Sequence, residues 1–279
     1  MAFAPPRLLP LPPPPPASAA ASTRAVSARH HGGRTAPELS GPTPRVVVVT
    51  SGKGGVGKTT TTANLAASLA RLALPAVAVD ADAGLRNLDL LLGLENRVHL
   101  TAADVLAGDC RLDQALVRHR ALQDLHLLCL SKPRSKLSLA FGSKTLTWVA
   151  DALRRSPNPP AFILIDCPAG LLECDGIKDI KIIVNRVRPD LVKGEDMMSA
   201  LDVQEMLGLP LLGVVPEDAE VIRSTNRGVP LVLNDPPTPA GLALEQATWR
   251  LVERDAMTAV MVKEQERPKK KGGFFSFFG

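Results

Sequence analysis

Aromatic residues are scarce in this chain, which has no tyrosine, two tryptophans and seven phenylalanines among 279 residues. Cysteine is scarce too, and no C-x-x-C pair or nearby histidine pattern occurs, which argues against a zinc site or a disulfide framework. The cysteines are Cys110, Cys129, Cys167 and Cys174. No apolar run approaches the roughly 20 residues of a membrane-spanning helix. What remains is a chain with 45% hydrophobic residues, long enough for one large α/β core in a reducing compartment.

A broad basic face is also lacking. The net charge is +5, but much of it comes from the two ends, and the composition between them is balanced. One small basic cluster consists of Lys132, Arg134, Lys136 and Lys144. No aromatic residues interleave with it, as they do in many surfaces that bind single-stranded nucleic acid, so we interpret it as a solvated face. The sequence therefore predicts no nucleic-acid partner.

Residues 1–44 differ from the rest of the chain. They hold 11 of the 25 prolines, several arginines and serines, and one acidic residue, Glu38. An arginine-bearing, acid-poor N-terminal segment is typical of an organellar transit peptide. The alternative is a Pro-rich disordered arm that stays on the mature protein.

A glycine-rich loop follows the first apolar strand, Val46–Val49. Four consecutive β-branched residues predict a central parallel strand that is buried on both faces. Gly52–Thr59 then matches G-x-x-x-x-G-K-[ST], the phosphate-binding P-loop, and a helical pattern begins at Lys58. In such a loop the backbone N–H groups surround the phosphates, the lysine reaches the β/γ-phosphates and the hydroxyl ligates Mg²⁺. The predicted nucleotide-binding residues are Gly52, Lys53, Gly54, Gly55, Val56, Gly57, Lys58, Thr59 and Thr60.

Carboxylates end two further apolar strands. Ala76–Val79 leads into Asp80 and Asp82, and Phe162–Ile165 leads into Asp166. Acidic residues at the carboxyl ends of parallel strands lie where such sheets bind ligands. Asp166 is expected to hold Mg²⁺ through water, Asp80 to support the metal region, and Asp82 to orient a water for attack on the γ-phosphate. By pattern alone, the Asp80–Asp82 pair could equally begin a surface loop.

Three motifs together resemble one family. K-G-G-V-G-K-T, from Lys53 to Thr59, is similar to the deviant Walker A motif of the MinD/ParA ATPases. D-x-D-x-G-L-R-N-L-D, from Asp80 to Asp89, and D-C-P-A-G, from Asp166 to Gly170, resemble the switch I and switch II segments of the MinD members. The resemblance implies a doubly wound, mostly parallel α/β sheet that binds ATP and Mg²⁺.

The same resemblance assigns roles that pattern alone does not. Lys53 would cross the interface of an ATP-bound homodimer, and Lys53, Lys58 and Asp82 would be the catalytic residues. Thr59, Asp166 and Asp80 would be the metal-binding residues. Asn185, Pro216 and Asp218, from an N-R-x turn and a P-E-D turn, would flank the adenine ring; each alone could be ordinary turn chemistry.

The spacing after Gly170 departs from the family. The next apolar strand, Ile180–Val184, begins after only nine residues, whereas a parallel crossover needs a dozen or more. The family places a helix, a strand and a second helix here, so about 40 residues of its pattern are expected to be absent. A splice variant or an incorrect gene prediction would produce this. Neighbouring strands should then lose a pairing partner and expose apolar surface.

The remaining pattern predicts helices and strands on both sides of this break. Short helices are expected at Leu100–Leu106 and Leu112–Val117, a strand at Leu125–Leu130, and a helix at Gly142–Arg154 with Leu146, Val149 and Leu153 on its buried face. After the break, an amphipathic helix is expected at Glu195–Leu207, a strand at Leu211–Val215 and a last long helix at Leu242–Val262. The family resemblance implies a further helix at Val221–Arg227. Met198, Leu201 and Met206 are predicted to reach the core.

The last residues, 267–279, combine basic and aromatic side chains. Such a tail suits the surface of an anionic bilayer, with lysines at the headgroups and phenylalanines in the acyl boundary. One tail should bind weakly and two tails on an ATP-closed dimer more tightly. The alternatives are that the phenylalanines pack on the domain or that the end is disordered. The predicted membrane-contacting residues are Lys269, Lys270, Lys271, Phe274, Phe275, Phe277 and Phe278.

These observations predict a transit segment at 1–44, a P-loop ATPase domain at 45–266 that is incomplete between 170 and 180, and a membrane-targeting tail. The family resemblance implies an ATPase that positions the chloroplast division site from the stromal side of the inner envelope membrane, with MinE-like and other plastid division partners. One alternative is a ParA-like DNA-partitioning ATPase. Another is a scaffold whose catalysis is impaired by the missing block.

Overall fold

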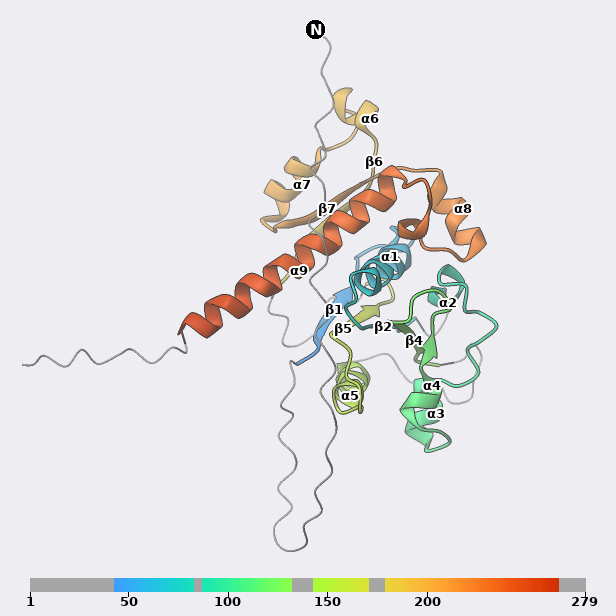
Figure 1. The fold of residues 1–279 in the computed structure, drawn as a ribbon. Helices are drawn as coiled ribbons and strands as arrows, with labels where there is room; N and C mark the ends of the chain where they lie inside the picture. The colour runs from blue at the N-terminus through green and yellow to red at the C-terminus, as the bar shows by residue number, and fades with distance from the viewer. Residues whose placement is uncertain (1–42, 83–86, 132–142, 171–178, 266–279) are drawn as a thin grey trace, which may run out of the picture. The chain divides into compact units, whose positions relative to one another are not determined.

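The computed structural model describes residues 43–82, 87–131, 143–170 and 179–265 (Figure 1). Their main sheet has five strands in the order β1-β5-β2-β4-β3. The first four are parallel, and the short β3 pairs antiparallel with β4. The strands are β1 (Arg45–Val49), β2 (Ala76–Asp80), β3 (Val117–Arg118), β4 (Leu125–Cys129) and β5 (Phe162–Asp166).

The register of this sheet brings the predicted site residues together at the carboxyl ends of the strands. Val49 lies opposite Asp166, and Asp80 lies opposite Asp166 on the other side. The P-loop follows β1 directly, so the loop and both carboxylates meet at the carboxyl ends of the strands. This is where open α/β sheets bind their ligands.

Helices cover both faces of the five-stranded sheet, as the doubly wound prediction required. On one face, α1 (Lys58–Arg71) contacts β1, β2, β4 and β5, and it also packs on α9 (Pro239–Gln265). On the other face, α5 (Ser143–Arg154) buries Leu146, Val149 and Leu153 against the strands, which confirms the predicted face of this helix. Two hydrophobic clusters therefore lie on either side of the sheet.

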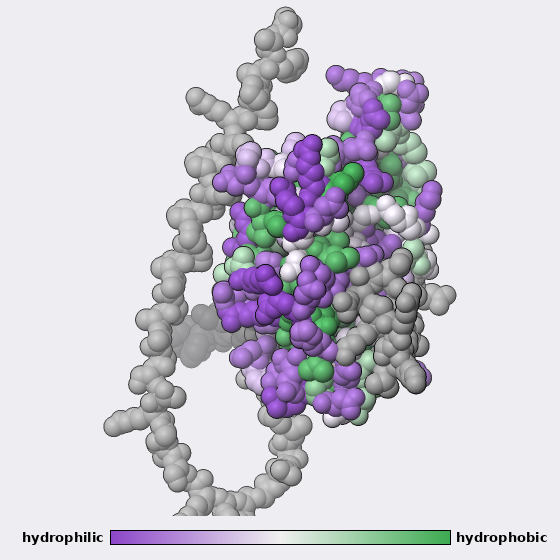
Figure 2. Space-filling model, turned by 90° about the vertical axis from the view of Figure 1, so that its right-hand side faces the viewer, coloured by the Kyte–Doolittle hydropathy of each residue, from purple (hydrophilic) through white to green (hydrophobic). Residues whose placement is uncertain are grey.

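Shorter helices complete the described chain (Figure 1). Before the break they are α2 (Leu88–Leu91), α3 (Ala102–Ala107) and α4 (Leu112–Ala115), and after it they are α6 (Pro189–Lys193), α7 (Ala200–Leu207), α8 (Glu220–Arg227) and the 3-10 turn η1 (Leu231–Leu233). The face turned toward the viewer in Figure 2 is mostly hydrophilic, with hydrophobic side chains in the spaces between polar ones.

The chain after the break forms a second, separate sheet. It consists of β6 (Ile182–Val187) and β7 (Leu211–Pro216), which are parallel to each other. Within the described residues, neither strand pairs with the five-stranded sheet. α9 links the two sheets through apolar packing, because it contacts both β7 and α1.

The prediction that Val46–Val49 forms a central strand buried on both faces is wrong. β1 is the edge of the five-stranded sheet, and its five residues are all half-buried. By contrast, all five residues of β2 and of β5 are buried. The apolar pattern predicted the strand correctly, but the neighbour that would enclose it is not among the described residues.

The predicted core contacts of α7 are also wrong. The side chains of Met198, Leu201 and Met206 are 49%, 72% and 64% exposed. The helix is shorter than predicted, beginning at Ala200 after a capping box at Ser199, and none of its residues is buried. It rests on a sheet of only two strands, so most of its apolar surface has nothing described to pack on.

Several predictions fall outside the described residues. They concern the segment at 1–42, the membrane tail at 266–279, most of the short connection after Gly170 (171–178), most of the basic cluster and Cys174. Lys144, the member of that cluster that is described, is exposed. Of the other cysteines, Cys129 and Cys167 are buried and Cys110 is half-buried.

Candidate nucleotide-binding site

The P-loop curls because two of its glycines adopt backbone conformations that other residues avoid. Gly55 has a φ of 74° and Gly57 a φ of 96°, and Gly57 is also the N-cap of α1. A Cβ atom added at Gly52, Gly54 or Gly55 would meet nothing within 4 Å, so the space above the loop is open. The loop therefore presents backbone N–H groups and a helix N-terminus to that space.

A cavity of about 1120 Å³ lies beside this loop. Its lining comes from the P-loop and α1, from the ends of β2 and β5, and from β6, β7 and α8. Most of the predicted site residues line it, namely Gly54, Gly55, Gly57, Lys58, Thr59, Thr60, Asp82, Asp166, Asn185, Pro216 and Asp218. Gly52, Lys53, Val56 and Asp80 do not. The structure thus collects residues from five separated segments at one place.

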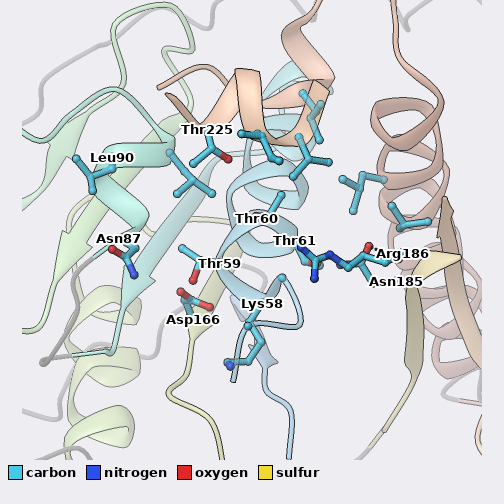
Figure 3. A pocket seen from close by; sticks show the side chains of 18 of the residues that line it. Lys58, Thr59, Thr60, Thr61, Asn87, Leu90, Asp166, Asn185, Arg186 and Thr225 are labelled. Atoms are coloured by element: carbon cyan, nitrogen blue, oxygen red, sulfur yellow. Dashed lines mark hydrogen bonds between the residues drawn. The ribbon is translucent and has the colours of Figure 1, made fainter. Parts of the chain in front are cut away.

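Thr59 and Asp166 form the polar centre of the cavity, next to Lys58 (Figure 3). The Thr62 hydroxyl donates a 3.3 Å hydrogen bond to the Asp166 carboxylate. Burial raises the pKa of Asp166 to about 6, although hydrogen bonds from Thr59 and Thr62 and the charge of Lys58 act in the opposite direction. A hydroxyl and a carboxylate are hard oxygen ligands, so this pair fits Mg²⁺.

Asp80 is buried, does not line the cavity, and binds the backbone of Asp82 and Leu88. Its side chain is 2% exposed, and its carboxylate accepts hydrogen bonds from the backbone N–H groups of Asp82 and Leu88, each 3.1 Å long. Burial raises its pKa to about 7, and the hydrogen bond from Leu88 opposes that rise. Asp80 therefore supports Asp82 and the N-terminus of α2, and direct metal binding by this residue stays a prediction.

Asn185 reaches the P-loop from the second sheet. Its Nδ2 donates a 2.8 Å hydrogen bond to the Val56 carbonyl oxygen and lies 2.5 Å from where a Cβ of Gly57 would be. The next residue, Arg186, has a φ of 60°, and its N–H donates to Asn185 Oδ1 over 2.9 Å. The side chain predicted to flank adenine is thus also a tether of the phosphate loop.

Asp218 is engaged by the backbone of two helices. Its carboxylate accepts hydrogen bonds from the N–H groups of Glu220, at 2.9 Å, and Ala240, at 3.2 Å. These bonds fix the P-E-D turn at the starts of α8 and α9. Because Pro216 and Asp218 both line the cavity, this turn forms part of its wall.

Sequence reasoning missed several cavity residues. Asn87 and Leu90 line one side, and Arg186 and Thr225 line others (Figure 3). Asn87 stands inside the quoted switch I motif and Arg186 inside the N-R-x turn, so both could have been named. Thr225 lies on α8, where no local pattern separates a cavity residue from an exposed one.

Lys53 has a different position from Lys58. It is exposed on the loop and does not line the cavity, while Lys58 does. The Ser51 hydroxyl donates a 2.8 Å hydrogen bond to the Lys53 carbonyl oxygen, which holds this part of the loop. The ammonium group of Lys53 is therefore available outside its own cavity.

The cavity as a whole fits a magnesium nucleotide. An open glycine loop with inward N–H groups suits phosphates, and the Thr59–Asp166 pair suits the metal. The volume is of the size that small-molecule ligands require, roughly 300–1000 Å³ or slightly more.

Known proteins agree with this geometry. A family model for the CobQ/CobB/MinD/ParA nucleotide binding domain matches residues 47–231. The chloroplastic septum site-determining protein minD homolog of Arabidopsis thaliana is 63% identical over 278 residues, with 87% of this chain and 84% of that protein covered. In a solved MinC:MinD cell division protein complex from Aquifex aeolicus, the matching chain is 32% identical with a TM-score of 0.62, over 75% of this chain and 95% of that one.

A further solved structure carries a nucleotide. MinD from Pyrococcus horikoshii, complexed with Mg-ADP, is 26% identical with a TM-score of 0.61, over 78% of this chain and 98% of that one. The comparison with the Arabidopsis protein spans 278 positions, whereas 87% of 279 residues is about 243, so about 35 positions have no residue of this chain opposite them. The absence of about 40 residues after Gly170 stays a prediction.

The motifs, the cavity and the extent of the matches lead to one assignment. Residues of the P-loop, of both switch motifs (Asp82, Asn87 and Asp166 among them) and of the N-R-x and P-E-D turns line one cavity. The chain belongs to the CobQ/CobB/MinD/ParA family of nucleotide-binding proteins and, within it, to the MinD branch.

Proposed function

We propose that this protein is an ATP-driven switch that binds Mg-ATP, closes into a homodimer on a membrane and hydrolyses the nucleotide. The observation that carries this proposal is the cavity itself. Its lining includes the P-loop, Asp82 and Asp166, together with Asn185 and Asp218 from the second sheet and the turn that follows it. Bound Mg-ATP supplies the phosphoanhydride bond that is broken. The protein supplies binding, orientation and a position for the attacking water.

Each cavity residue has a chemical role in this proposal. Lys58 neutralises phosphate charge, and Thr59 and Asp166 hold Mg²⁺. Asp82 accepts a hydrogen bond from the attacking water, so it positions the nucleophile. Asn185, Pro216 and Asp218 form the side of the cavity suited to the base. Lys53, exposed outside its own cavity, reaches the partner's phosphates when two copies close around their nucleotides.

Membrane contact is assigned to the last residues of the chain. Among the described residues, no helix is both long and apolar enough to cross a bilayer. The tail from Lys269 to Phe278 pairs lysines with phenylalanines, which suits shallow insertion at an anionic surface. Because a single tail binds weakly, the ATP-bound dimer gains avidity that the monomer lacks.

The biological role follows from the relatives. The Arabidopsis relative is chloroplastic and is named for septum-site determination, and the Aquifex structure is a MinC:MinD complex. We place this protein in the chloroplast, on the stromal side of the inner envelope membrane, where it positions the division site. Its partners in this role are MinE-like and other plastid division proteins.

Co-sedimentation with anionic liposomes tests the switch. The protein from residue 45 to residue 279 should pellet with the liposomes in Mg-ATP and stay in the supernatant in Mg-ADP. Lys53→Ala should abolish ATP-dependent pelleting while leaving nucleotide binding intact, because Lys53 does not line its own cavity. A chain ending at residue 266 is the matched control for the lipid step, since it should dimerise with ATP and fail to pellet. Equal pelleting in both nucleotides would contradict the proposal.

The divided sheet supports a second candidate, a scaffold that binds partners without a working ATP cycle. The five-stranded and two-stranded sheets share no strand pairing within the described residues, although both line the cavity. A thermal-shift measurement separates the two functions. A rise in melting temperature with Mg-ATP, together with phosphate release that Asp82→Asn abolishes, supports the ATPase. No shift with either nucleotide supports the scaffold.

A further inference from the structure

β1 is an edge strand of the main sheet, and it is longer than the two-residue β3 at the other edge. β1 pairs with β5 along its whole length, in an unbroken register from Arg45–Phe162 to Val49–Asp166. On its other side, none of the strands in the described ranges pairs with it. All five of its residues keep partial exposure to solvent.

The direction of the β1 backbone groups follows from two hydrogen bonds to β5. The Arg45 N–H donates to the Ala161 carbonyl over 2.9 Å, and the Cys167 N–H donates to the Val49 carbonyl over 3.1 Å. Along a parallel strand, alternate residues direct their N–H and C=O groups to opposite sides. The backbone N–H and C=O groups of Arg45, Val47 and Val49 therefore bond to β5. Those of Val46 and Val48 point away from β5, to the outer edge of the strand.

This edge carries none of the usual features that discourage pairing. Natural edge strands are protected by lysine, proline, inward charges or bulges. β1 has four consecutive valines, no bulge in its register and a single charge at its first residue. The Arg45 guanidinium is turned aside, since its Nη1 donates to the Leu251 carbonyl over 2.9 Å. An extended apolar strand is thus the chemistry that fits this edge.

The two outer edges of the smaller sheet, along β6 and along β7, are poorer templates. The pairing between β6 and β7 has register irregularities after Ile182 and after Val184. β6 also contains Arg186, which is exposed and has a φ of 60°. A second strand would meet this irregular backbone with fewer aligned groups, so β1 is the edge to consider.

We propose that two copies of this chain associate through β1, edge to edge and antiparallel, about a twofold axis at Val47. In this register Val46 of one copy faces Val48 of the other, so the outward groups of both residues pair directly. About four N–H···O=C hydrogen bonds form, and the two five-stranded sheets become continuous. Arg45 faces Val49 of the second copy, so like charges do not oppose each other.

A second copy is favoured as occupant because the edge is complementary to itself. The same two residues supply all donors and all acceptors, and the valine side chains meet valine side chains on both faces of the pair. Association of this kind needs no nucleotide. It is therefore separate from the ATP-dependent dimer that involves Lys53.

Sedimentation velocity of the full chain without nucleotide tests this proposal. A dimer should form as the protein concentration rises, and Lys53→Ala should leave it unchanged. Val46→Pro removes an N–H group that makes no bond to β5 but would donate to the second copy in the proposed dimer. This variant should therefore sediment as a monomer and keep the circular dichroism spectrum of the folded protein. Val47→Pro is the matched control, because it removes an N–H that bonds to β5 and should unfold the chain.

Two results would overturn the proposal. One is a wild-type chain that stays monomeric without nucleotide at all concentrations, and the other is a dimer that Val46→Pro leaves intact. If Val46→Pro fails to fold, hydrogen exchange of wild type decides the matter. Exchange at the Val46 and Val48 amides should slow as protein concentration rises, and concentration-independent exchange there would equally overturn the pairing.

Discussion

Asn185 Nδ2 donates a hydrogen bond of 2.8 Å to the carbonyl oxygen of Val56. This bond joins β6, in the two-stranded sheet, to the P-loop that follows β1 in the five-stranded sheet. It is a direct polar link between two sheets that share no strand pairing within the described chain. The shape of the phosphate loop therefore depends on a side chain 129 residues further along the sequence.

Asn185→Asp tests this link. The substitution keeps the oxygen that accepts from the Arg186 N–H and replaces the donor to Val56 by a second oxygen. A typical hydrogen bond contributes about 1 kcal/mol, so we expect about three- to tenfold weaker binding of a fluorescent ATP analogue. Arg186→Ala, which leaves the tether in place, is the comparison for general damage to this turn. Unchanged affinity in Asn185→Asp would show that the P-loop holds its shape alone.

A close approach of two glycines joins α2 to α8. A Cβ at Gly93 would lie 2.7 Å from the Gly228 carbonyl oxygen, and one at Gly228 would lie 2.8 Å from the Gly93 Cα. We expect Gly228→Ala to lower the free energy of unfolding by about 1–3 kcal/mol, through backbone strain and overpacking. Urea denaturation measures this change.

Gly208→Ala is the matched control for that substitution. Gly208 has a φ of 62°, close to the 63° of Gly228, but a Cβ there would meet nothing within 4 Å. Gly208→Ala therefore introduces the same strain of a positive φ, without a close contact like that between Gly228 and Gly93. If both variants lose the same stability, the close packing of α2 on α8 contributes nothing.

His119 is expected to make the fold sensitive to acid. The side chain is 8% exposed, and its Nδ1 accepts hydrogen bonds from the N–H groups of Ala121 and Leu122. Burial, and then the charge of Arg97, lower the pKa of His119 below its ordinary value of 6.5. The stability from the neutral ring is thus complete above pH 6.5 and is lost as the pH falls through the lower folded value.

Two substitutions isolate this effect. In His119→Asn the amide oxygen can accept from the same two N–H groups and does not titrate, so the unfolding free energy should depend less on pH below 6.5 than in the wild type. His119→Ala leaves two donors without a protein acceptor and should cost about 1–3 kcal/mol at pH 7.5. An identical pH profile for wild type and His119→Asn would exclude the histidine as the cause.

The exposed position of Leu201 gives a simple prediction about α7. Leu201→Ala should change the free energy of unfolding by less than about 0.5 kcal/mol, because the side chain is 72% exposed. Leu153→Ala, at a fully buried position on α5, should cost about 2–5 kcal/mol. A large loss in Leu201→Ala would mean that this side chain is covered in solution, contrary to the structure.

Local sequence patterns predicted most of the single elements and the site motifs. The valine run, the glycine spacing and the acids that follow apolar strands are short-range signals, and each led to the correct strand, loop or helix. The 3.6-residue spacing of Leu146, Val149 and Leu153 also predicted their burial correctly. These signals depend on neighbouring residues alone, so one sequence contains them.

Positions that depend on distant neighbours were not predictable in the same way. Four valines have the same composition whether a strand lies beside them or not, so the edge position of β1 could be inferred only from the short spacing after Gly170. An amphipathic pattern indicates that α7 has an apolar side, but not whether another element covers it. The bond from Asn185 to Val56 depends on where β6 lies in space.

The nucleotide cavity takes its walls from both sheets, and this has a consequence for the life of the protein in the cell. A ligand that contacts both walls stabilises the folded state, and this stabilisation grows with the logarithm of the ligand's free concentration once that concentration exceeds the Kd. We therefore expect ATP supply to govern turnover, with empty copies cleaved first by proteases. A proteolysis time course with and without Mg-ATP would reveal this, and equal cleavage rates would refute it. A protein so built would be longest-lived in well-energised plastids.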